Sequence, residues 1–223
     1  MRVYPFPDKL ASREELKRDL LYHKIPAQDL DAIADRAWDT GAAAAAAALE
    51  EHPRQTIYEV AKAEGLAVEH RAVDKVSGKV RYFSEYYAGR KTIFLYDDSI
   101  RKWADANGLS QGAAEELILA HEIFHHFECT RLGQTSRQYT VPQLELGPVK
   151  LGRSGIRALS EIGAHGFSYT WYEARGRLPH REGAAQLVNH SVNDAEFQGR
   201  DTARKIFEDN PIMRALSGKG QKK

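Results

Sequence analysis

The chain has very little cysteine: Cys129 is the only one among 223 residues. A single cysteine excludes an intramolecular disulfide framework, and it also excludes a metal site built from several thiolates. An excess of one charge is lacking as well, because 32 Lys and Arg residues stand against 31 Asp and Glu residues. This balance argues against a protein whose whole surface binds a polyanion, and no nucleic-acid-binding motif is present.

Long apolar segments are also lacking. No window approaches ~18 uninterrupted apolar residues, and the alanine run 42–48 is short and only weakly apolar. The N-terminal segment 1–8 has no apolar core of the kind that a secretory signal needs. We therefore expect a cytoplasmic protein with no membrane partner and no direct contact to nucleic acid.

The composition that is present fits a globular chain. The hydrophobic fraction is 42%, and at ~150 residues per domain the length corresponds to one domain with an appendage. We expect an N-terminal helical extension over 1–55, a main domain over 56–215 and a disordered tail over 216–223. In the extension, Ser12 begins a capping box before a first helix, Pro26 interrupts, and residues 27–51 form a second helix.

The main domain shows strand signals followed by helix signals. A capping box at Thr56 begins a short helix, and the aromatic-rich segment 80–87 forms a hairpin with 91–96. With a further strand in 66–73, these segments predict a small, mostly antiparallel sheet. The later helices are expected at 97–107, 112–130, 156–175 and within 183–208, and a long structureless loop is expected at 133–155. The fold class is therefore α+β.

The helix 112–130 carries the pattern His-Glu-Ile-Phe-His at positions 121–125. Residues four apart share one face of a helix, so the imidazoles of His121 and His125 can bind one Zn²⁺. Glu122 follows the first ligand directly and can act as the general base for a metal-activated water. The simpler interpretation is a core helix whose histidines and carboxylate hydrogen-bond to neighbours, but the mid-helix context favours the metal site.

A catalytic zinc site needs a third protein ligand and an open position for water. Cys129 lies ~12 Å along the helix axis from His121, too far to share one ion, and we expect it to be a small buried or half-buried hydrophobic residue. The next helix offers Glu161 and His165, which are four apart and share a face. We favour Glu161 as the third ligand, and His165 would then hydrogen-bond to a metal ligand and orient it. The alternative is that His165 is itself the third ligand.

The order of these segments resembles the ImmA/IrrE family of zinc metallopeptidases. The resemblance covers about 56–172 and begins with a short helix that leads into a strand near Leu66. Its further motifs are Lys91-Thr92-Ile93-Phe94-Leu95-Tyr96, then Glu116-Leu117-Ile118-Leu119-Ala120-His121-Glu122-Ile123-Phe124-His125, and finally Glu161-Ile162-Gly163-Ala164-His165-Gly166-Phe167-Ser168, which is similar to the family's E-x-x-A-N-x-F-A stretch. The resemblance implies a zincin-like fold, with a small sheet packed on a helical bundle, and Glu161 as the third ligand.

The chain departs from the family pattern in three places. Phe124 stands where the family usually has a small residue, His165 replaces the usual Asn, and the loop before Glu161 is longer than usual. These departures concern the substrate groove and the surroundings of the metal more than the metal itself. The family often acts on a transcriptional repressor or is fused to a helix-turn-helix, and the segment 1–55 carries no helix-turn-helix pattern.

The expected function is that of a zinc-dependent endopeptidase that hydrolyses peptide bonds of a cytoplasmic, for example regulatory, protein. The oxyanion of such a reaction needs a donor besides the metal, and the candidates are His126, His165, Tyr139, Tyr169 and Tyr172. One alternative is a non-catalytic zinc-binding regulatory or interaction module, whose site would have four protein ligands. The other is one half of a toxin–antitoxin or phage-regulatory pair, in which the helices within 12–51 dock a partner.

Overall fold

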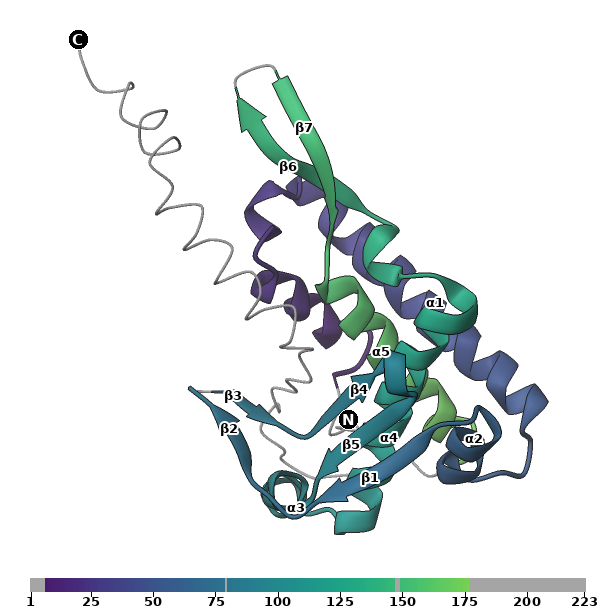
Figure 1. The fold of residues 1–223 in the computed structure, drawn as a ribbon. Coiled ribbons are helices and arrows are strands. Elements are labelled where there is room, and N and C mark those ends of the chain that lie inside the picture. Colours follow the sequence, from purple (N-terminus) through teal and green to yellow (C-terminus); the bar gives the residue numbers. More distant parts are fainter. Residues whose placement is uncertain (1–6, 79, 147–148, 177–223) are drawn as a thin grey trace. The chain divides into compact units, whose positions relative to one another are not determined.

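The computed structural model describes residues 7–78, 80–146 and 149–176. These residues form helices and small sheets, which confirms the expected α+β class (Figure 1). The helices expected within 183–208 and the tail expected at 216–223 lie outside the described residues. None of the described helices combines the length and the apolar character that crossing a membrane requires.

The described elements alternate between helices and short strands. The α-helices are α1 (Leu30–Glu51), α2 (Ile57–Ala63), α3 (Asp97–Asn107), α4 (Gln111–Phe127) and α5 (Ala158–Glu173). The strands are β1 (Ala67–Arg71), β2 (Lys75–Ser77), β3 (Val80–Tyr82), β4 (Ser84–Tyr87), β5 (Thr92–Tyr96), β6 (Thr140–Leu146) and β7 (Val149–Gly155). Short 3₁₀ helices cover Ala11–Arg18, Tyr22–Lys24, Ala27–Asp29, Ala88–Arg90 and Thr135–Arg137, and a π-helical turn covers Glu128–Leu132.

Local capping signals account for where two of the described α-helices begin, α2 and α4. Thr56 and Glu59 form the expected capping box at the start of α2. The Ser110 side chain accepts a hydrogen bond from the backbone N–H of Ala113 at the start of α4. The alanine run lies inside the continuous helix α1, as its high helix propensity predicts.

The capping box expected at Ser12 is wrong. Residues Ala11–Arg18 form a 3₁₀ helix with Leu10 before it, so Ser12 lies inside the helix instead of capping it. The Ser12 side chain is fully buried, and its hydroxyl lies 3.4 Å from Nδ1 of His165 on α5. The Ser12 side chain therefore contacts His165 instead of capping the helix, and no local sequence pattern indicates this tertiary contact.

The expected sheet is present, but it is mixed and smaller than the sequence indicates. β5 lies in the centre of a three-stranded sheet, parallel to β1 and antiparallel to β4. β2 and β3 form a separate antiparallel ribbon. The single strand expected at 80–87 is thus divided at Phe83, whose side chain is buried and whose backbone carbonyl accepts a hydrogen bond from the backbone N–H of Tyr96.

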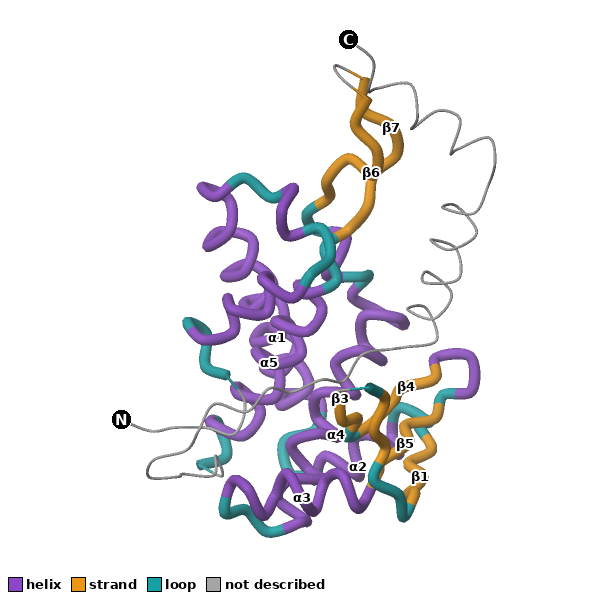
Figure 2. Tube along the Cα trace, turned by 90° about the vertical axis from the view of Figure 1, so that its left-hand side faces the viewer, coloured by secondary structure: helices purple, strands orange, loops and turns teal. Residues whose placement is uncertain are grey.

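The loop expected at 133–155 is wrong, because β6 and β7 form an antiparallel hairpin there. Figures 1 and 2 show this hairpin standing apart from the three-stranded sheet. The sequence pattern does not indicate this hairpin because Pro142 and Gly152 lie inside its strands, and Gln143 and Gly152 are not among the paired residues. A two-stranded ribbon tolerates proline and such an irregularity because each strand has an edge free of ladder hydrogen bonds.

Helices α1 and α5 pack with their backbones almost in contact. A Cβ atom built on Gly41 of α1 would lie 1.8 Å from the carbonyl oxygen of Gly163 on α5. A Cβ atom on Gly166 would lie 2.4 Å from the carbonyl oxygen of Trp38. Only glycine fits at such distances, so these positions set how closely α5 lies against α1. Helix α5 also packs on α4, and the ring of Phe124 fills the space beside Gly163.

Candidate metal centre

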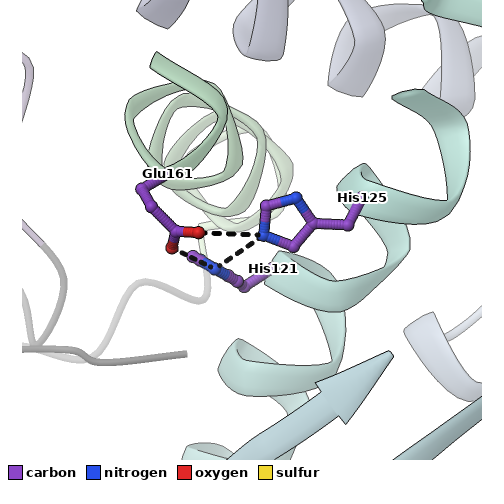
Figure 3. Close-up of side chains that lie close together, drawn as sticks. All are labelled: His121, His125 and Glu161. Carbon is purple, nitrogen blue, oxygen red and sulfur yellow. Dashed lines mark hydrogen bonds and ion pairs between the residues drawn. The ribbon is translucent and has the colours of Figure 1, made fainter. Parts of the chain in front are cut away.

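The two histidines of the HExxH pattern and Glu161 converge at the junction of α4 and α5 (Figure 3). Nε2 of His121 lies 3.2 Å from Nε2 of His125 and 3.2 Å from Oε2 of Glu161. Nε2 of His125 lies 3.7 Å from Oε1 of Glu161. The histidines are buried and Glu161 is partly exposed, so the group could hold a metal ion that is open to one side.

The spacing of these donor atoms suits a tetrahedral ion. Bonds of ~2.0–2.2 Å at tetrahedral angles place neighbouring ligand atoms ~3.3–3.5 Å apart. The two Nε2 atoms lie 3.2 Å apart, and each lies 3.2 or 3.7 Å from one of the two carboxylate oxygens of Glu161, so the observed separations are close to that value. Two imidazoles and one carboxylate are also a donor set that catalytic zinc sites use. The residues present therefore fit a zinc ion.

The electrostatics of the centre favour positive charge. Burial alone would lower the pKa of His125, but a hydrogen bond with Glu128 and the charge of Glu161 raise it to about 9. Burial alone would raise the pKa of Glu161, but the hydrogen bond with His121 and the charges of His125 and His121 lower it to about 2. The carboxylates stabilise a cation at this point, whether it is a proton on an imidazole or a metal ion.

Glu122 is buried beside the group, on the side of the sheet. Its Oε1 accepts a 2.6 Å hydrogen bond from the hydroxyl of Ser84 on β4. Two residues further along the strand, the hydroxyl of Tyr86 is hydrogen-bonded to Nδ1 of His126 at 2.8 Å. Positions two apart on a strand span ~6.6 Å and positions four apart on a helix span ~6 Å, so the two contacts are in register.

Of the side chains expected as oxyanion donors, the two histidines are both buried, but they have different neighbours. His126 is buried and held by Tyr86, and its second nitrogen lies 3.7 Å from Glu64. His165 is buried with its ring centroid 5.4 Å from that of His121, and burial, together with the charge of His121, lowers its pKa to about 3. A neutral His165 beside His121 suits a supporting position, and it is not part of the ligand group.

Two of the three tyrosines make contacts with other parts of the fold. The hydroxyl of Tyr139 donates a 2.6 Å hydrogen bond to Asp29. Tyr169 packs against Trp38, and its hydroxyl is 3.5 Å from Glu173. Along α5, Tyr169 and Tyr172 lie ~12 and ~16 Å from Glu161, since the helix rises ~1.5 Å per residue.

Cys129 and two further groups of potential ligands lie outside this centre. Cys129 is exposed, which corrects the expectation that it is a buried or half-buried hydrophobic residue: it lies in the π-helical turn after α4 and not on the core face of the helix. The group of Glu51, His52 and Glu64 already has a cation, because Arg131 donates to both carboxylates at 2.9 and 3.0 Å. The group that His70 forms with Asp97 and Glu115 includes an exposed histidine.

No protein-family model, no curated protein and no solved structure matches the chain. The likeness to the ImmA/IrrE family therefore stays a prediction from the sequence motifs. The functional argument rests on the side chains at the centre.

Two residues that touch this centre did not emerge from the sequence. Ser84 contacts Glu122 across a strand–helix interface, and its only sequence signal is that it interrupts an aromatic run. Glu128 contacts His125 through Nδ1 at 3.0 Å. Its spacing of three residues from His125 is a sequence signal for this contact, because residues three apart on a helix are neighbours on its surface.

Proposed function

We propose that the chain is a zinc-dependent peptidase of zincin-like architecture, with His121, His125 and Glu161 as ligands and Glu122 as general base. The observation that carries the proposal is that His121, His125 and Glu161 each offer one potential ligand atom within 4.8 Å of the others, beside a buried carboxylate held by Ser84. A set of three protein ligands is what a catalytic site has, whereas a structural zinc site has four.

The chemistry divides between the ion and the side chains. A bound zinc ion supplies Lewis-acid chemistry, which lowers the pKa of a water and polarises a peptide carbonyl. Glu122 accepts a proton at its carboxylate and returns it to the leaving amine. The hydroxyl of Ser84 holds the Glu122 carboxylate through Oε1. The proposed substrate is a protein or peptide in the cytoplasm.

The decisive experiment combines metal analysis with two variants of the full chain. The purified wild type should contain one zinc ion per chain and hydrolyse a peptide library or unfolded casein. Glu122→Gln should keep the zinc and lose hydrolysis, and His121→Ala should lose both. Wild-type protein that binds no zinc contradicts the proposal.

The non-catalytic alternative gives a different result in the same experiment. Zinc retained without hydrolysis by the wild type, together with unfolding on chelation, would favour a structural site. Hydrolysis that persists in Glu122→Gln would also contradict the assigned role of Glu122.

A further inference from the structure

The carboxylate of Glu128 connects three separate parts of the centre. The residue follows α4 directly, at the start of the π-helical turn, and only 6% of its surface is exposed. Its Oε2 lies 3.0 Å from Nδ1 of His125. Its Oε1 accepts hydrogen bonds from the backbone N–H of Thr135 at 2.8 Å and from the hydroxyl of Ser160 at 2.9 Å.

We propose that Glu128 is the positioning residue of the metal centre, which holds His125 with its proton on Nδ1 and ties the helix of His125 to the helix of Glu161. The inference rests on the proposed function, because it assigns His125 and Glu161 as ligands. Ser160 directly precedes Glu161, so one carboxylate anchors a ligand on α4 and the residue beside a ligand on α5.

The hydrogen bond between Glu128 and His125 determines which nitrogen of His125 carries the proton. An ionised carboxylate only accepts hydrogen bonds, so the contact between Glu128 and Nδ1 requires a proton on Nδ1. The neutral ring then presents the lone pair of Nε2, and Nε2 is the atom that lies near His121 and Glu161. Carboxylate groups that fix a ligating histidine in this way raise metal affinity.

A glutamine cannot replace this carboxylate without a conflict. If its amide oxygen accepts from Thr135, its NH₂ group faces Nδ1 of His125, and Nδ1 must then accept. The proton of the neutral ring moves to Nε2, which removes the lone pair that a metal needs. If the amide is reversed, its NH₂ group faces the backbone N–H of Thr135, and two buried donors oppose each other.

The test measures the zinc Kd of the full chain by competition with a chromophoric chelator. We expect Glu128→Gln to weaken zinc binding about 10- to 100-fold, the range for groups that orient a ligand. Ser160→Ala should weaken binding by a smaller factor, because it removes one of three hydrogen bonds and leaves the contact with His125. An unchanged Kd in folded Glu128→Gln overturns the proposal.

Glu85→Gln is the matched control. Glu85 is also a buried carboxylate, 8% exposed. It forms an ion pair with Lys75 at 2.6 Å and accepts a hydrogen bond from Tyr96. Among the described residues, it has no contact with a histidine. We expect this variant to lose thermal stability without a change in zinc Kd. Equal weakening of zinc binding in both variants would show a general loss of stability, and it would overturn the proposal.

A second measurement covers the case in which Glu128→Gln does not fold. In the zinc-loaded wild type, Hδ1 of His125 should give a resolved NMR resonance that exchanges slowly with water. The absence of a protected Hδ1 resonance overturns the proposal. If the protein has no peptidase activity but its zinc binding depends on Glu128, this inference is supported and the proposed function is contradicted. The failure of one can therefore be distinguished from the failure of the other.

Discussion

The hydroxyl of Ser84 donates a 2.6 Å hydrogen bond to Oε1 of Glu122 across the interface between β4 and α4. A hydrogen bond to a charged group is worth about 1.5–3 kcal/mol, and here it holds the carboxylate in one orientation. We expect Ser84→Ala to lower kcat about tenfold or more while KM and zinc content stay unchanged. Steady-state kinetics with metal analysis of the same samples checks this.

Ser168→Ala is the control for that prediction. Ser168 is a buried serine on α5 whose hydroxyl has no hydrogen-bond partner among the described residues. Its removal should leave kcat at the wild-type value. A kcat that falls equally in both variants would mean that Ser84 acts through packing and not through Glu122.

Gly41→Ala should destabilise the fold. Its new methyl group would lie 1.8 Å from the carbonyl oxygen of Gly163, so α1 and α5 would have to move apart. Overpacking of this kind costs about 1–3 kcal/mol in the free energy of unfolding, which urea denaturation measures. Gly112→Ala is the matched change on α4: nothing lies within 4 Å of its new methyl group, and we expect a gain of about 0.5–1 kcal/mol. Equal effects of the two changes would contradict the close packing.

Glu15 should make the stability of the metal-free protein depend on pH. Burial raises the pKa of Glu15 from 4.5 to about 7, while the neighbouring Arg18 lowers it and the charge of Glu161 raises it. Because the folded-state pKa is the higher one, this contribution to stability is fully present below pH 4.5 and is lost as the pH rises through 7.

The measurement compares the free energy of unfolding of the wild type and of Glu15→Gln from pH 4 to pH 8, with a chelator present. Relative to the variant, the wild type should lose up to about 3 kcal/mol over this range. Curves that run parallel would contradict the raised pKa of Glu15.

Zinc should stabilise the folded protein, because the three ligand atoms converge only in the folded state. Free zinc at 100 times its Kd adds about 2.7 kcal/mol to the free energy of unfolding, and Tm should rise with zinc concentration. His125→Ala should abolish the shift. His70→Ala, which removes an exposed histidine hydrogen-bonded to Asp97, should keep it. A wild-type Tm that is the same with zinc and with EDTA would contradict the site.

The parts of the fold that follow from the sequence are those with local causes. The start of α2 is set by Thr56 and Glu59, and the start of α4 by Ser110, all within one turn of the helix that they begin. The β6–β7 hairpin and the division at Phe83 depend on partners that a periodicity does not reveal. Ser12 shows the same limit, since its contact with His165 replaces the cap that its sequence neighbours predict.

The candidate site divides in the same way. The pairing of His121 with His125 follows from helical spacing alone. Glu161 is favoured as the third ligand by its residue type and its place on the next helix, and the family resemblance implies the same residue. Ser84 could not be found without the tertiary structure, because the strand-to-helix contact brings together residues far apart in the chain. Glu128 had a local signal in its spacing from His125, but its contacts with Thr135 and Ser160 required the fold.

The close packing of Gly41 against Gly163 has a consequence for the order of events during synthesis. Helix α1 is made before α5, so the face of α1 around Gly41 has no partner on α5 until residues 42–163 have also been made. At ~5–20 residues per second, synthesis of these residues takes about 6–24 seconds, during which the face of α1 around Gly41 has no partner on α5. Glu161 emerges only two residues before Gly163, so the proposed third ligand is made at the same time as the helix face that packs on α1. A nascent chain that stops short of α5 would therefore hold both histidines of the pattern but only part of the metal centre.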